Sequence, residues 1–302
     1  MAPQTERQRS KSARNKLRRF FLLPRRYGIT SKRFIENLGD MASMLKEHGI
    51  VGTFPITATV LARHAEIAGV LEGMEIAVHG RNHVDLTALT KTEQEASVIS
   101  AVEVFREHGI NAVGFRAPYL RCNNSLLEVL GKAGFLYDSS IAVVWSCGHR
   151  FDSLPEMNEA LNSYGVAKAG NATPLNKFDI IELPVALPDD EILIDRLEVV
   201  KTDSISQALK GMVRSATDTH GHLVLQLHPE RFHIYKEAMA ETIAFAREKD
   251  AWIAPLREVA KWRGEGGGGE MKWPKGNPFA ITISGDVDAA TLGDFLGRRM
   301  GR

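Results

Sequence analysis

The chain has 302 residues, of which 44% are hydrophobic, and it carries 38 Lys plus Arg against 37 Asp plus Glu. This composition excludes an intrinsically disordered chain, and a net charge of +1 argues against a dedicated nucleic-acid-binding protein. Two cysteines are too few for a disulfide framework, and no run of about 18 apolar residues is present to span a membrane. The N-terminal apolar run Phe20–Leu23 is too short for a secretory signal, so we expect a cytoplasmic protein.

Charge is unevenly distributed along the chain. Residues 1–26 carry a net charge of +8, and the remaining residues carry −7. A basic segment of this kind is typical of a solvated, flexible arm, and we expect one over residues 1–26. Attraction of this arm to a polyanion or a membrane surface is the functional alternative.

From residue 31 onward the sequence alternates between helical and strand patterns. Amphipathic spacing predicts a helix over 31–47, and a capping box formed by Thr90 and Glu93 predicts another that runs to about Arg106. Further helices are expected over 58–70, 124–133, 204–216, 234–248 and 255–262. Short apolar runs predict strands over 50–54, 75–78, 112–115, 135–137, 180–185, 223–227, 251–253 and 279–283.

This alternation predicts an α/β fold in which helices surround a parallel sheet. About eight strands over this length favour a (β/α) barrel over an open doubly wound sheet. Residues 264–270 have the composition of a glycine-rich linker, and the segment 271–302 beyond it holds the last predicted strand.

Two pairs of polar residues follow predicted strands. His79 and His83 come directly after the strand over 75–78, at a spacing that lets two imidazoles converge on one metal. Asp286 and Asp288 follow the strand over 279–283, and strand alternation places both carboxylates on one side. One carboxylate can bind a cation while the other acts as a general base. Solvated histidines and a turn or helix cap are the alternatives for the two pairs.

Arg116 and His228 end two further predicted strands. An arginine in this position can hold a catalytic carboxylate, and a histidine can act as a general acid. Structural ion pairs and hydrogen-bonded rim histidines are common, so neither residue is specific alone. Together with the two pairs they lie at the C-terminal ends of four strands, where barrel enzymes keep their active sites.

Six sequence blocks carry a resemblance to a known family. They are Thr53–Pro55, His79–His83, Gly114–Tyr119, Gly134–Ser140, Leu227–Pro229 and Ser284–Asp288. The chain resembles the polysaccharide deacetylase (NodB-homology) family, carbohydrate esterase family 4, over most of residues 27–302. It is most similar to the branch with an Asp-x-Asp first motif, which includes peptidoglycan-deacetylase-like and allantoinase-like proteins. The implied fold is a distorted (β/α) barrel of the polysaccharide deacetylase type.

The resemblance also implies roles for the site residues. It assigns a divalent metal, with Zn²⁺ the expected ion, to Asp288, His79 and His83. It assigns catalysis to Asp286 as base, Arg116 as its orienting residue, His228 as acid and the backbone N–H of Tyr119 at the oxyanion. The family's partner for the acid histidine is not assigned, although Asp138 and Trp145 lie in the corresponding region.

The order of the motifs departs from the family. The Asp-x-Asp motif normally comes first, whereas here it comes last, so the sequence is similar to a circular permutant. We expect 27–263 to form the main part of the barrel, 264–270 to be the linker, and 271–302 to complete the same barrel. The first and last strands of a barrel are neighbours, so one slot can be filled from either chain end. A fused reading frame, in which 271–302 does not dock, is the competing explanation.

Three functions remain to be separated. The first is a metal-dependent deacetylase acting on an N-acetylated sugar, and the second keeps the site but takes a small cyclic amide or ureide. The third is a non-catalytic barrel whose basic arm binds a polyanion; its salt-sensitive binding would survive His79→Ala and be lost with residues 1–26. For the first two we expect no specific nucleic-acid partner, and a homo-oligomer is left open.

Overall fold

The computed structural model describes residues 23, 26–162, 164, 175–266 and 273–298. Within them lies one 11-stranded sheet in the order β5-β8-β9-β11-β1-β2-β3-β4-β7-β6, with β10 paired to β11. The strands are β1 (Thr53–Ile56), β2 (Glu75–Val78), β3 (Gly114–Phe115), β4 (Tyr137–Asp138), β5 (Ala142–Val144), β6 (Leu175–Lys177), β7 (Ile180–Glu182), β8 (Val185–Leu187), β9 (His222–Leu227), β10 (Trp252–Ile253) and β11 (Ala280–Gly285). Among the described residues, the pairings of these strands are parallel except that of β6 with β7.

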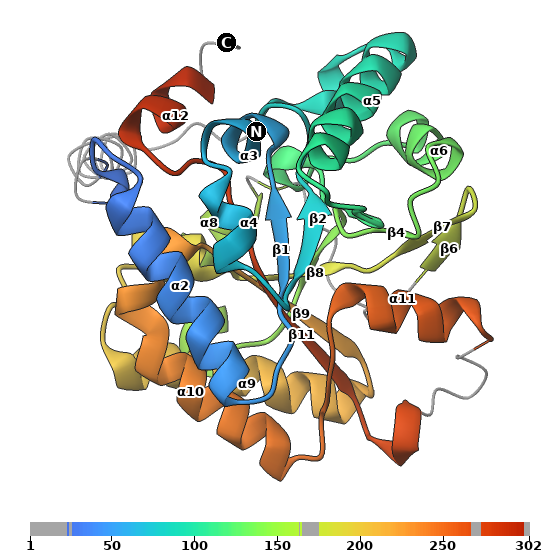
Figure 1. The fold of residues 1–302 in the computed structure, drawn as a ribbon. Coiled ribbons are helices and arrows are strands. Elements are labelled where there is room, and N and C mark those ends of the chain that lie inside the picture. The colour runs from blue at the N-terminus through green and yellow to red at the C-terminus, as the bar shows by residue number, and fades with distance from the viewer. Residues whose placement is uncertain (1–22, 24–25, 163, 165–174, 267–272, 299–302) are drawn as a thin grey trace, which may run out of the picture.

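Helices cover the outside of the curled sheet (Figure 1). They are α2 (Lys32–Glu47), α3 (Ala58–Arg63), α4 (Glu66–Val70), α5 (Lys91–Glu107), α6 (Asn124–Lys132), α7 (His149–Asp152), α8 (Pro155–Asn162), α9 (Thr202–Thr219), α10 (Phe232–Glu248), α11 (Leu256–Gly264) and α12 (Leu292–Gly297). A π-helical segment spans Glu191–Arg196. In the part of the chain that is described, no helix has the length and apolar character needed to cross a membrane.

The predicted amphipathic elements are confirmed. Helix α2 lies within the predicted range 31–47 and buries one apolar face, which includes Phe34, Leu38, Met41, Met44 and Leu45. Helix α5 starts with the predicted capping box, in which Thr90 accepts from the Glu93 N–H and the Glu93 side chain accepts from Thr90. Both features place apolar side chains against the sheet and satisfy the free N–H groups of the first turn.

The prediction of one strand over 180–185 is wrong, because two strands, β7 and β8, occupy this stretch. Pro184 separates them and has no N–H for a sheet hydrogen bond. β7 pairs with β4, and β8 pairs with β5. The carboxylate of Glu182 accepts hydrogen bonds from the N–H groups of Ser140 and Ile141, between β4 and β5. Residues 137–144 therefore pair with residues 180–187 twice, as β5 with β8 at one end of the strand order and as β4 with β7 near the other. This double pairing curls the sheet into a distorted (β/α) barrel.

The C-terminal strand β11 lies inside the sheet rather than at an edge. Its six residues pair with β9 from Ala280↔His222 to Gly285↔Leu227, and Ser284 pairs with Thr53 of β1. Just beyond it, Val287 donates to the Pro55 carbonyl. Residues 286–288 are thereby fixed at the C-terminal ends of the central strands.

Aromatic side chains hold both flanks of β11. The indole of Trp273, buried to 1% exposure, donates to the His220 carbonyl at 2.9 Å and stacks on Trp262 with centroids 4.7 Å apart. After the strand, the Phe295 ring of α12 stacks on Tyr27 at 5.0 Å. Segments from opposite ends of the chain therefore share one small apolar cluster.

Two expected segments fall largely outside the described residues. Of the basic arm over 1–26, the structure describes Leu23 and Arg26, both of which are buried. Arg26 forms an ion pair with Asp195. Of the linker over 264–270, it describes Gly264, where α11 ends, and the two residues that follow.

Candidate metal centre and active site

Two histidines and a carboxylate converge at the C-terminal ends of the central strands. His79 and His83 follow β2, and Asp288 follows β11. The His79 Nε2 lies 3.2 Å from Asp288 Oδ1, and the His83 Nε2 lies 3.2 Å from Asp288 Oδ2. One potential ligand atom from each residue lies within 4.8 Å of the others. The structure thus brings together the three residues that the sequence predicted as ligands.

The protonation of the two imidazoles suits a divalent metal. His79 Nδ1 lies 2.7 Å from the Arg116 carbonyl, which only accepts, so Nδ1 carries the proton and Nε2 is free to ligate. Burial lowers the pKa of His83 to about 3, so this imidazole is neutral. His83 Nδ1 and Asp288 Oδ1 are buried and have no hydrogen-bond partner among the described residues. Two imidazoles and one carboxylate form a donor set typical of catalytic zinc.

The charge of Asp288 is stabilised by its neighbours. Burial on its own would raise its pKa, but the two histidines and Arg298 hold it well below the usual range. His79 responds in the opposite sense, since its contact with Asp288 raises its pKa against the effect of burial. The carboxylate is therefore ionised, as metal ligation requires.

A second carboxylate, Asp286, is held beside this cluster by two donors. The fully buried guanidinium of Arg116 donates to Asp286 Oδ1 at 2.5 Å and to the Ser284 hydroxyl at 2.8 Å. Gln226 Nε2 donates to Asp286 Oδ2 at 2.9 Å. Arg116 is fixed in turn by the Ser139 carbonyl, which accepts from its Nε at 3.0 Å. Both oxygens of Asp286 are thus oriented by fixed donors.

His228 forms a buried pair with Asp190. Its Nδ1 lies 2.6 Å from Asp190 Oδ1, and its backbone N–H donates to Asp190 Oδ2 at 2.9 Å. Burial would lower the pKa of His228, but the Asp190 carboxylate outweighs this and raises it well above the usual value. His228 is therefore protonated at neutral pH, as a general acid must be.

Neither residue suggested by sequence as a partner of His228 has that role. Asp138 accepts from the Ser140 hydroxyl at 2.6 Å and lies beside Glu182, and burial raises its pKa. Trp145 is buried against Gly221. The reason is topological: the chain leaving β8 passes next to β9 and brings Asp190 to His228. Asp190 could have been found by the same signal as the other site residues, because it follows shortly after the apolar strand β8.

Gln226 was also missed by sequence reasoning. It lies on β9 two residues before His228, so strand alternation places the two side chains on one face. That alternation was the signal that would have found it.

Tyr119 borders the cluster in an uncommon backbone conformation. Its φ of 60° lies in the left-handed region, which is costly for a residue with a side chain and is often found at functional sites. Its ring meets that of His83 edge-on at 4.4 Å, and its hydroxyl donates to the His83 carbonyl at 3.3 Å. The side chain is 45% exposed, so it stands at the rim of the site.

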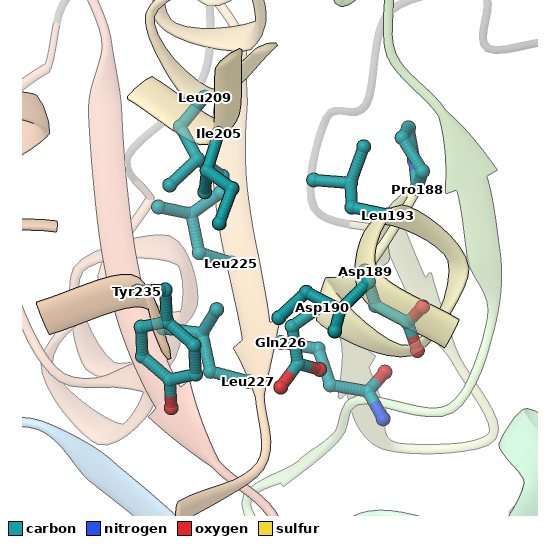
Figure 2. Close-up of a pocket in the computed structure, with 11 residues that line it drawn as sticks. Pro188, Asp189, Asp190, Leu193, Ile205, Leu209, Leu225, Gln226, Leu227 and Tyr235 are labelled. Carbon is teal, nitrogen blue, oxygen red and sulfur yellow. The ribbon is translucent and has the colours of Figure 1, made fainter. Parts of the chain in front are cut away.

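Two cavities adjoin these residues. One is polar and is lined by Thr57, Thr59, Val60, Arg63, Asn82, His83, Asp288, Asp294 and Arg298. The other lies beside β9, where Asp189, Asp190 and Gln226 gather on one side and Ile205, Leu209 and Leu225 on the other (Figure 2). Burial, with the charges of Glu191 and Asp190, raises the pKa of Asp189 to about 7.

Sequence comparisons point to one family. The family described as polysaccharide deacetylase matches residues 36–137. A peptidoglycan deacetylase-like protein of Gibberella zeae is 37% identical over 71 residues, which is 23% of this chain and 21% of that protein. A chitooligosaccharide deacetylase of a Bradyrhizobium species is 29% identical over 128 residues, which is 41% of this chain and 56% of that protein. The matches therefore span about a fifth and about half of these curated relatives.

Solved structures share the fold. A structure described as a candidate polysaccharide deacetylase from Mycobacterium smegmatis has a TM-score of 0.58 at 23% identity, covering 76% of this chain and 78% of that one. A PuuE allantoinase has a TM-score of 0.59 at 16% identity, covering 76% and 72%. At these identities the likeness concerns the fold, a distorted barrel of the deacetylase type. The family match is confined to residues 36–137, and the solved structures add the likeness of fold.

Proposed function

We propose that this protein is a metal-dependent hydrolase that removes the N-acetyl group from an amino-sugar substrate. The observation that carries the proposal is the convergence of His79, His83 and Asp288, which fit a divalent metal such as Zn²⁺. The oriented Asp286 and the protonated His228 complete an acid–base pair at the same strand ends. The relatives named as deacetylases support the substrate class.

Each step of the hydrolysis has a residue suited to it. When bound, a divalent metal supplies Lewis-acid polarisation of the amide carbonyl. Asp286, held by Arg116 and Gln226, accepts a proton from the attacking water as its oxygen bonds to the carbonyl carbon. The backbone N–H of Tyr119 is proposed to donate to the oxyanion that forms. His228 then gives its proton to the amine nitrogen as the C–N bond breaks, releasing acetate and the free amine.

The amide-hydrolase assignment is tested on the purified protein. We expect acetate release from acetylated chitooligosaccharides, its loss on chelation, and its loss together with bound metal in His79→Ala. The matched control is His108→Ala, because His108 caps the C-terminal end of helix α5 and its imidazole Nδ1 contacts the Val104 carbonyl of the same helix. Small cyclic amides and ureides form a second arm. Hydrolytic ring opening of these compounds, with no acetate release from acetylated sugars, would replace the sugar substrate and leave the site assignment intact.

We also propose that the chain is a circular permutant in which 27–263 and 271–302 form one barrel joined by the linker 264–270. The six-residue pairing of β11 with β9, and its contact with β1, support this arrangement. Removing 271–302 should abolish metal binding and acetate release, because it removes Asp286 and Asp288. Retention of both in the truncated protein would exclude these carboxylates from the site and favour the fused-frame explanation.

A further inference from the structure

Arg298, just after helix α12, lies at the candidate metal centre without a place in the mechanism above. Its guanidinium donates to Asp288 Oδ2 at 2.9 Å. The same group lies over the Phe295 ring, 4.0 Å from the centroid, and its side chain is 17% exposed. Arg298 also lines the polar cavity that reaches His83 and Asp288. A cation held this close to a site for a divalent metal needs an explanation.

The neighbouring carboxylates are engaged elsewhere. Asp294 accepts from the Arg63 guanidinium at 3.0 Å, contacts His64 at 2.9 Å, and closes the capping box of α12. Glu230 accepts from Tyr27 and from Arg231. Within the described ranges, Asp288 is therefore the carboxylate that pairs with Arg298.

Sharing Asp288 with a divalent metal leaves excess positive charge in the cavity. One carboxylate cannot neutralise both a guanidinium and a divalent cation, and a largely buried site screens the repulsion poorly. An acetamide is neutral and adds no compensating charge. An anionic group elsewhere on the substrate would supply it, and a guanidinium binds carboxylate or phosphate through two parallel hydrogen bonds.

We propose that Arg298 determines specificity by binding an anionic group, a carboxylate or a phosphate, on the N-acetylated substrate. This inference rests on the proposed deacetylase function and narrows its substrate class to acidic amino sugars. The Phe295 ring lies 4.0 Å from the guanidinium carbon and restricts the plane of the group, and Arg298 lines the polar cavity. A role limited to orienting Asp288 is the opposing explanation.

Three probes separate charge from the rest of the sugar. They are N-acetylglucosamine, which is neutral, N-acetylmuramic acid, which carries a carboxylate, and N-acetylglucosamine 6-phosphate. In Arg298→Gln we expect kcat/KM to fall by about 10- to 100-fold for whichever acidic probe the native protein prefers. The fall should come mainly from a higher KM, as expected for loss of a charge-assisted hydrogen-bonded pair. The value for the neutral sugar should fall by a clearly smaller factor, since that loss reflects only the contact of Arg298 with Asp288, and Arg298→Lys should recover part of the loss on the acidic probe. Arg214→Gln, which removes an exposed arginine stacked on Phe245, is the matched control.

Metal content and binding measurements separate the possible failures. An equal loss on all three probes, accompanied by loss of bound metal, would overturn the proposal in favour of an orienting role. Calorimetric titration of the probes into Asp286→Asn protein, which lacks the proposed base but keeps the three proposed metal ligands, measures binding without turnover. In this variant, tighter binding of an acidic probe than of the neutral sugar, lost when Arg298→Gln is added, supports the anion site. That support stands even if native protein hydrolyses none of the three probes. Such a lack of hydrolysis would overturn the deacetylase assignment alone. Equal affinity for acidic and neutral probes in both backgrounds would overturn the anion site alone.

Discussion

Replacing Asp190 by asparagine tests the assignment of His228 as a general acid with little change in shape. The variant keeps an oxygen that can accept from His228 Nδ1, but it removes the charge and turns the acceptor of the His228 backbone N–H into a donor. Burial then dominates, and the pKa of His228 falls from its raised value. Less of the imidazole is protonated at neutral pH, so protonation of the departing amine slows.

The size of the effect follows from the contact that is lost. A buried hydrogen bond to a charged group contributes about 1.5–3 kcal/mol, which corresponds to roughly a 10- to 100-fold loss of kcat/KM. The sign of the pH effect is also fixed. His228 acts while protonated, so native activity should persist to alkaline pH and decline as the pH rises through the raised pKa; in the variant this decline should begin at lower pH.

The assay is acetate release from an acetylated chitooligosaccharide, measured as kcat/KM across the pH range. Asp152→Asn is the matched control, because Asp152 also accepts a backbone N–H, that of Cys147, and is an exposed residue at the end of helix α7. Its profile should follow that of native protein. If the Asp190→Asn profile overlays the native one in height and in its alkaline decline, the pairing does not support acid catalysis by His228.

Three further predictions concern the framework of the site. Arg116→Lys keeps the charge but cannot serve both Ser139 and Asp286; we expect about 1–3 kcal/mol lower stability in urea titrations and a reduced kcat, and an unchanged kcat would contradict its positioning role. Trp273→Ala removes a buried indole that anchors the start of the C-terminal segment and should cost about 3–5 kcal/mol, whereas an unaltered urea midpoint would mean that the segment does not dock. His83→Ala should lose bound metal by elemental analysis, and full occupancy would remove His83 from the ligand set.

Much of the fold follows from the sequence because apolar runs and polar strand ends are local signals. The strand Glu75–Val78 and the start of α5 are as predicted, since each depends on neighbouring residues alone. The convergence of the strand-end residues follows from a general property of parallel sheets, whose C-terminal ends meet at one edge.

Other features depend on contacts that periodicity does not encode. The change from β7 to β8 at Pro184 reflects pairing with β4 and β5, which are far away in sequence. Asp190 becomes the partner of His228 because β8 lies next to β9. Helix α12 was missed although Thr291 and Asp294 form a capping box, a local signal that was available.

The central claim is that His79, His83 and Asp288 hold a divalent metal that hydrolysis requires. The most direct test is metal analysis and acetate release measured on the same preparation, before chelation, after chelation and after metal is returned. The proposed site predicts a stoichiometric divalent metal, loss of acetate release when it is removed, and recovery when it is restored. Undiminished acetate release from metal-free protein would contradict the claim.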